Sequence, residues 1–234
     1  MLRSLLVGVL LGGVAATACE AASLSVAPTR VELGPGDPAA VVTLQNNAAE
    51  PVMVQVQTFA WPRSMASGDL EPTRELLAVP PVAELAGNAR QIIRVALRAP
   101  LVGGREQAYR LLITEVPRGT GSGTGVRIAL RLSLPVFVTP PDAAPKPVWS
   151  LRQERGAISL VLANTGDAHL QVRRIVLRPA DRPGSAQTIE SPAYVLAGQE
   201  HSWPLPAGLA ADALQLEVET NLGQLPATVV PPRG

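Results

Sequence analysis

Short stretches of alternating hydrophobic and polar residues run through most of this chain, separated by prolines, glycines and asparagine-rich turns. The clearest stretch is 126–134, where aliphatic residues occupy every second position and Arg127, Ala129, Arg131 and Ser133 fill the others. A period of two predicts a β-strand, because successive side chains of a strand point to opposite faces. No helical period of comparable length competes with this pattern, so we predict an all-β protein.

The strand-like segments fall into two groups. The first group comprises 24–33 (interrupted at Pro28), 41–44, 52–56, 91–97, 109–116 and 126–134. The second comprises 149–151, 158–163, 170–177, 194–196, 201–205 and 214–220. Many short strands at this spacing predict an antiparallel sandwich for the first group.

A proline-rich stretch separates the two groups and contains Pro140, Pro141, Pro145 and Pro147. Proline has no backbone N–H to donate and stiffens the chain, so this stretch is expected to act as a linker. We therefore predict a first β domain over residues 22–140, a linker over 141–147 and a second β domain over 148–234. The stiff linker is expected to form an elbow between the two domains.

The first residues have the composition of an export signal: one positive charge at Arg3, an apolar run over 5–16 and small residues after it. This order predicts a signal peptide over residues 1–21 and an exported, periplasmic protein. Cleavage after Ala21 would remove Cys19, the only cysteine, whereas cleavage after Ala18 would keep it. A lipid-modified N-terminus at Cys19 is a further alternative.

The composition argues against several classes of function. The chain has 20 basic and 19 acidic residues, a net charge of +1, and Lys146 is its only lysine. A protein this neutral is not expected to bind nucleic acid by neutralising many phosphates. Two histidines and one cysteine provide few ligands, so we expect no metal site and no cofactor.

No catalytic arrangement is recognisable. The nucleophile elbow Gly-x-Ser-x-Gly is absent, and only His169 and His201 are available as a histidine base. We interpret His169, which follows a turn, as an exposed or half-buried turn residue, and His201 as an ordinary strand residue. The glycine-rich segments carry no Walker lysine, so no phosphate site is expected. We predict that the protein is not an enzyme and binds no small-molecule substrate.

The segment 126–134 allows two interpretations. Its aliphatic residues could fill the core of their own domain, with Arg127 and Arg131 facing solvent. Alternatively, the segment is an exposed edge strand, because the glycine-rich loop 119–125 precedes it and Pro135 removes a ladder donor just after it. An exposed edge with aliphatic side chains is an aggregation hazard unless it serves to pair with a strand of another chain.

The chain resembles a known family over most of its length. The matching segments are 25–31, 44–47 with Trp61, 79–82, 85–95 and 109–117, followed more loosely by 163–166 and 169–170. In their order and spacing these segments are similar to the two-domain, immunoglobulin-like periplasmic chaperones of the chaperone–usher pathway, which assemble pili. The resemblance implies two immunoglobulin-like β-sandwich domains set at an angle, in the shape of a boomerang.

The resemblance also implies a mechanism. In this family the chaperone lends an edge strand to a pilus subunit whose own fold lacks one strand, and alternate aliphatic side chains fill the open groove of the subunit. By this resemblance the donated side chains would be Val126, Ile128, Leu130, Leu132 and Leu134.

The family anchors the C-terminal carboxylate of the subunit with two basic residues between the domains. Arg30 matches the first of them. The second is usually a lysine, whose position here is occupied by Pro135, so this chain departs from the pattern. Arg110 is the replacement that we expect, with Arg131 as the alternative, and the departure suggests a divergent branch such as the archaic, spore-coat-type systems.

The leading hypothesis is therefore a chaperone that stabilises pilus or fimbrial subunits and delivers them to an outer-membrane usher. The alternative is a secreted two-domain adhesin or structural subunit, but residues 23–30 are too short and too proline-interrupted to serve as its donor extension. We also expect the free protein to protect its edge by self-association or through disorder of the loop 118–125.

Overall fold

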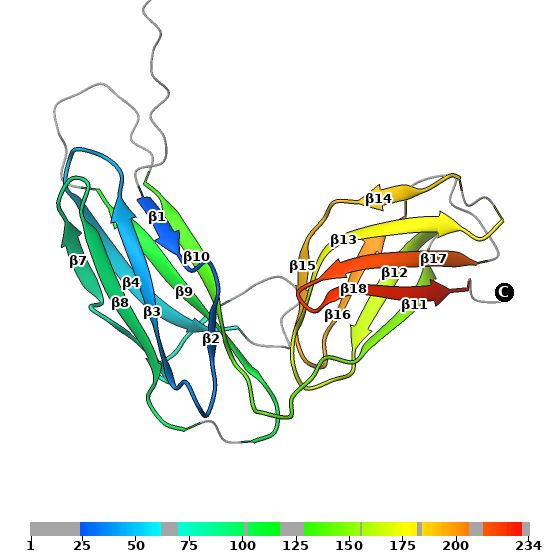
Figure 1. Cartoon of the computed structure of the whole chain (residues 1–234), viewed down its shortest axis with the longest axis horizontal. Coiled ribbons are helices and arrows are strands. Elements are labelled where there is room, and N and C mark those ends of the chain that lie inside the picture. Colours follow the sequence, from blue (N-terminus) through cyan, green and yellow to red (C-terminus); the bar gives the residue numbers. More distant parts are fainter. Residues whose placement is uncertain are drawn as a thin grey trace, which may run out of the picture.

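The computed structural model describes residues 24–61, 70–100, 103–117, 129–154, 156–181, 184–205 and 213–230. These residues form strands and turns, and no helix among them is long and apolar enough to cross a membrane. Figure 1 shows two sandwiches that meet at one end and diverge from there, as the linker predicted. The prediction of an all-β chain with two sandwich domains is confirmed.

Two sheets form the first sandwich. One has the strand order β1 (Leu24–Ala27), β3 (Ala39–Asn46), β8 (Arg90–Leu97) and β6 (Leu76–Val79). The other has the order β2 (Val31–Leu33), β10 (Arg131–Val138), β9 (Gln107–Val116), β4 (Val52–Ala60) and β5 (Glu71–Pro72). A further strand, β7 (Val82–Leu85), pairs with β4.

The first strand of the chain changes sheets at Pro28. Before it, β1 pairs antiparallel with β3; after it, β2 pairs in parallel with β10 of the other sheet. The peptide bond between Ala27 and Pro28 is cis. One continuous segment therefore ties the two sheets together at the side of the sandwich where β10 lies.

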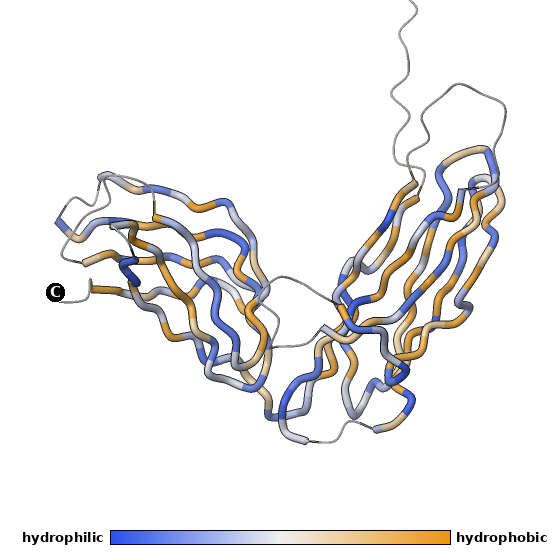
Figure 2. Tube along the Cα trace, turned by 180° about the vertical axis from the view of Figure 1, so that it is seen from behind, coloured by the Kyte–Doolittle hydropathy of each residue, from blue (hydrophilic) through white to orange (hydrophobic). Residues whose placement is uncertain are grey.

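The core of the first domain follows from the alternation in the sequence. Along β4, for example, Val52, Val54 and Val56 are buried, and the residues between them face outward. Figure 2 shows this alternation of hydrophobic and hydrophilic positions along the strands of both sandwiches. Burial of these aliphatic rows on the inner faces drives the two sheets together.

The second sandwich has sheets of different size. The smaller has the order β11 (Pro147–Glu154), β12 (Ala157–Asn164) and β16 (Glu200–Pro204). The larger has the order β14 (Gln187–Ile189), β13 (Leu170–Pro179), β17 (Leu214–Thr220) and β18 (Gly223–Val229), and β15 (Ala193–Val195) also pairs with β13. Trp203 fills the centre and donates its indole N–H to the carbonyl of Ser191 at 2.9 Å.

A buried asparagine at the end of β12 fixes the chain between the domains. The Asn164 amide donates to the carbonyls of Ala168 and Val195, and its oxygen accepts from the backbone N–H groups of Lys146 and Gly166. These bonds hold the last residues of the linker against the second domain, because Lys146 directly precedes β11.

Gly166 lies so close to the linker that it can carry no side chain. A Cβ at this position would lie 2.2 Å from the carbonyl oxygen of Ala144. We expect Gly166→Ala to displace the linker and to lower the free energy of unfolding by about 1–3 kcal/mol. For a chain of this size, that corresponds to a decrease in Tm of about 2–4 °C per kcal/mol in a thermal melt.

Gly184→Ala is the matched control, because a Cβ at Gly184 meets no atom within 4 Å. Its Tm should stay close to that of the wild type. Equal melting temperatures for the two variants would show that the linker does not pack against Gly166 as described.

Candidate functional site at the free edge and between the domains

Strand β10 has one free edge over part of its length. It pairs with β9 throughout, from Arg131 to Val138, but with β2 only from Val136 to Val138. Among the described residues, no strand covers the other edge of 131–135. Pro135 stands where the pairing with β2 begins, and since it carries no N–H it cannot extend that ladder.

The strand differs from the predicted one in both bounds. It was expected over 126–134 with Pro135 just beyond its end, but it begins at Arg131, so that Ala129 and Leu130 precede it, and it runs through Pro135 to Val138. Pro135 is accommodated because the parallel pairing with β2 starts only at the next residue. Val126 and Ile128 lie outside the described residues.

The three remaining aliphatic candidates lie on the core side of the sheet and are buried to different degrees. Leu134 is 3% exposed and is part of the core of its own domain. Leu132 and Leu130 are half-buried and pack against that core. Burial therefore decreases from Leu134 toward the start of β10, where the aliphatic side chains lie at the margin of the sandwich.

Pairing of the strands places Arg30, Pro135 and Arg110 in one row. Val31, Val136 and Tyr109 are paired across β2, β10 and β9, and all three point into the core. Arg30, Pro135 and Arg110 are the sequence neighbours of these three residues, so they lie on the opposite face of the sheet. The row of Arg30, Pro135 and Arg110 thus faces the second domain.

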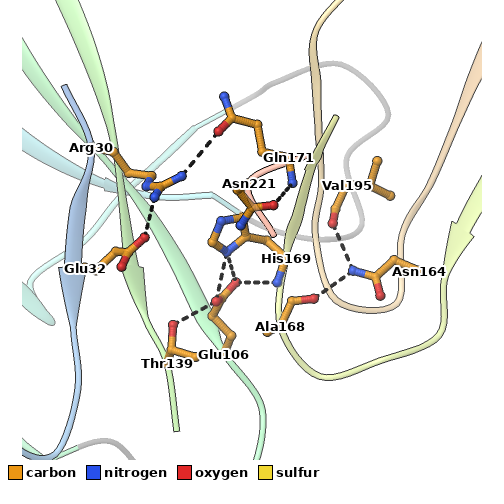
Figure 3. Close-up of polar contacts among 10 residues, drawn as sticks. All are labelled: Arg30, Glu32, Glu106, Thr139, Asn164, Ala168, His169, Gln171, Val195 and Asn221. Atoms are coloured by element: carbon orange, nitrogen blue, oxygen red, sulfur yellow. Dashed lines mark hydrogen bonds and ion pairs between the residues drawn. The ribbon is translucent and has the colours of Figure 1, made fainter. Parts of the chain in front are cut away.

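The Arg30 side chain contacts both domains. Its Nη2 lies 2.8 Å from the carboxylate of Glu32, and its Nη1 donates to the amide oxygen of Gln171 in the second domain at 3.2 Å. Figure 3 shows Arg30 between these two partners. Glu32 is 59% exposed, so its ion pair with Arg30 is open to solvent and is weak.

The Arg110 guanidinium is stacked on an aromatic ring. Its Cζ lies 3.7 Å from the centroid of the Trp61 ring and 5.8 Å from that of Tyr194. Burial lowers the pKa of Arg110, and no carboxylate within the described part of the chain forms an ion pair with it. A half-buried cation whose described partners are aromatic faces is a favourable place for an anion.

Aromatic rings from both domains form the floor between the sandwiches. Phe137 of β10 stacks on His169 with ring centroids 3.6 Å apart, and it also contacts Trp61 and Tyr194. Trp61 and Tyr194 meet edge to face at 5.8 Å. The rings join the outer face of the β9–β10 sheet to the start of β13 and to β15.

A buried carboxylate completes the contact between the domains. Glu106 is 5% exposed, and its oxygens accept from the backbone N–H of His169, from His169 Nδ1 and from the Thr139 hydroxyl, at 2.8–2.9 Å. A carboxylate only accepts hydrogen bonds, so Nδ1 must carry the hydrogen. The expectation that His169 would be an exposed or half-buried turn residue was wrong, because the ring is 6% exposed and is held by Glu106.

Other candidate chemistry lies elsewhere or is not found. His201 lies in β16 against Trp203, and burial lowers its pKa. No three histidine, cysteine, aspartate or glutamate side chains within the described ranges are grouped so that they could hold a metal ion. Arg131 is exposed at the start of β10, next to the half-buried Leu132.

Sequence reasoning missed the contributions of the second domain to this site. Gln171 and Tyr194 carry no motif, and they approach Arg30 and Arg110 only through the packing of the two sandwiches. Glu106 was likewise not singled out, since its partners lie 33 and 63 residues away along the chain.

A family model decides the relationship of this chain. The model of the pili and flagellar-assembly chaperones, for the PapD N-terminal domain, matches residues 23–144. The chain belongs to this family. Among curated proteins, none matches its sequence.

Solved structures of low sequence identity share the fold of this chaperone. The CsuC–CsuE chaperone–tip adhesion subunit pre-assembly complex, from the archaic chaperone–usher Csu pili of Acinetobacter baumannii, contains a chain with 21% identity and a TM-score of 0.68, covering 91% of this chain and 100% of that one. A chain of the SafA pilin–SafB chaperone complex of Salmonella enterica has 17% identity and a TM-score of 0.66, covering 91% of this chain and 98% of that one. The CupB2 chaperone of Pseudomonas aeruginosa has 18% identity and a TM-score of 0.61, covering 89% of this chain and 100% of that one. The two sandwiches are thus of the immunoglobulin-like kind.

The contact of Glu106 with His169 and Thr139 gives a testable prediction. Glu106→Gln keeps the shape of the side chain but removes the charge that accepts from His169 and Thr139, so we expect the free energy of unfolding to decrease by about 1–3 kcal/mol. The melting temperature should decrease, and small-angle X-ray scattering should detect a wider range of angles between the domains.

Glu217→Gln is the matched control, because Glu217 forms an exposed ion pair with Arg178 within the second domain. It should change neither measurement noticeably. If Glu106→Gln behaved like this control, the hydrogen bonds of Glu106 would contribute little to the arrangement of the domains.

Proposed function

We propose that this protein is a periplasmic chaperone that binds pilus subunits by lending them the free edge of β10 and then delivers them to an outer-membrane usher. Its membership in the family of pilus-assembly chaperones supports this function. The observation that carries the mechanism is the uncovered edge of 131–135, which ends at a row of two arginines between the domains. Family and fold are those of proteins that act without catalysis, and the proposed mechanism needs no cofactor.

Strand donation uses the physics of an open sheet edge. The free N–H and C=O groups of β10 can pair with a strand of the subunit, which protects an edge that would otherwise aggregate. We propose that Leu130 and Leu132, together with Val126 and Ile128, enter the groove of the subunit. Leu134 lies on the same face of the strand, but its side chain is buried in the core of the first domain. In this proposal it stays there and supports the donated side chains from below.

We further propose that Arg30 and Arg110 hold the C-terminal carboxylate of the subunit. A guanidinium can bind a carboxylate with two parallel hydrogen bonds. The exposed Glu32 is easily displaced from Arg30, and Arg110 has no carboxylate partner among the described residues. Their common row puts both cations at the end of the free edge.

The setting of this activity follows the same proposal. Residues 1–21 would direct export to the periplasm, and the free chaperone would protect its edge by self-association or through disorder of the loop 118–125; both segments lie outside the described residues. A strictly monomeric free protein in which this loop and the edge strand are both rigidly ordered would contradict the proposed protection of the edge.

Co-expression in the periplasm with pilin-like subunits from the same genome tests the mechanism. Leu130→Glu places a charge among the donated aliphatic residues, and Arg30→Ala removes a carboxylate ligand. We expect the wild type to co-purify with a subunit as a one-to-one complex, and each variant to retain at least about tenfold less of it.

Two matched variants control for fold and charge. Val41→Glu introduces the same charge at a half-exposed aliphatic side chain of β3, and Arg94→Ala removes an exposed arginine of β8. Both should retain the subunit, and melting curves should show that all four variants are folded. A complex that survives Leu130→Glu and Arg30→Ala in folded protein would exclude strand donation with this anchor.

A further inference from the structure

The second domain presents two polar groups to the arginine row. Gln171 and Tyr194 are opposite each other in the pairing of β13 with β15, so their side chains lie on the same face. Gln171 reaches Arg30, and the ring of Tyr194 lies near Arg110. A cross-strand pair of the second domain thus faces the row of the first.

The backbone of Gln171 is held firmly. Its N–H donates to the side-chain oxygen of Asn221 at 2.9 Å, and its C=O accepts from the Asn221 N–H at 3.1 Å. Asn221 lies in the turn between β17 and β18. Figure 3 shows Asn221 beside Gln171, whose side chain extends toward Arg30.

The Gln171 amide has a defined orientation and a donor group that no described residue accepts from. Its oxygen must face Arg30, because a guanidinium donates and cannot accept. The NH2 group is then left at the site, and no acceptor for it is found among the described residues. Arg30 also keeps N–H groups beyond those bound to Gln171 and Glu32.

We propose that Gln171 is the ligand that the second domain supplies to the C-terminal carboxylate of the subunit. Its NH2 donates to a carboxylate oxygen, while its own oxygen keeps Arg30 oriented. The site then presents donors from Arg30, Arg110 and Gln171 and so selects a free carboxylate over an amide, whose NH2 would meet donors only. This inference rests on the carboxylate anchor of the proposed function.

Peptides test this role directly. The probe is a synthetic copy of the C-terminal strand of a pilin-like subunit from the same genome, prepared as the free acid and as the C-terminal amide. Calorimetry should show that the wild-type chaperone prefers the acid. Gln171→Leu should reduce that preference about tenfold while leaving the affinity for the amide nearly unchanged, since a hydrogen bond to a charged group is lost.

A second variant separates a ligand from a residue that only orients Arg30. Gln171→Lys keeps a donor but has no acceptor for Arg30, so we expect it to retain the preference for the acid within about threefold. Gln215→Leu, at an exposed glutamine of β17, is the matched control and should behave like the wild type.

Each other outcome overturns the proposal in a distinguishable way. If Gln171→Leu keeps the preference while Arg30→Ala loses it, the anchor stands and Gln171 is not part of it. If Gln171→Leu and Gln171→Lys both lose it, Gln171 acts only by orienting Arg30. If the wild type binds acid and amide equally, the carboxylate anchor fails as well.

Discussion

The arrangement of this molecule depends on one buried carboxylate. Glu106 belongs to the first domain, and two of its three hydrogen-bond donors belong to His169 of the second. A charge taken out of water must be fully hydrogen-bonded, so this contact tolerates few relative positions of the domains. The stacking of Phe137 on His169 and the approach of Gln171 to Arg30 follow from it, because His169 and Gln171 are two residues apart at the start of β13.

The free edge follows from a second constraint, the course of the first strand. The segment that begins beside β3 crosses to the other sheet and covers β10 only beyond Pro135. A longer β2 would close the sheet, and a proline-free β10 would allow it to do so. Among the residues that the structure describes, this edge is thus uncovered at the place where the half-buried Leu130 and Leu132 lie.

The sequence allowed the strands and the two sandwiches to be predicted, because alternation and proline positions are local signals. It also placed Arg30 and Arg110 among the candidates, through resemblance to a family. It did not predict the partners of these arginines. The stacking of Arg110 on Trp61 and the bonds of Glu106 with His169 join residues far apart in the chain, and they arise from packing that no periodicity records. The bounds of β10 were missed for a similar reason: whether a proline can lie inside a strand depends on what pairs with its other edge.

In the proposed complex, the row of Arg30, Pro135 and Arg110 would fix the register of the partner strand. If the last residue of that strand is held at this row, the position of every other residue along β10 is set by its distance in sequence from the chain end. Because side chains alternate with a period of two, one extra residue at that end would turn every inward side chain outward, and two extra residues would restore the original facing. Under the proposed anchor, the row would therefore distinguish partner strands by whether they end at an even or an odd number of residues from their inward side chains, without reference to any particular side chain.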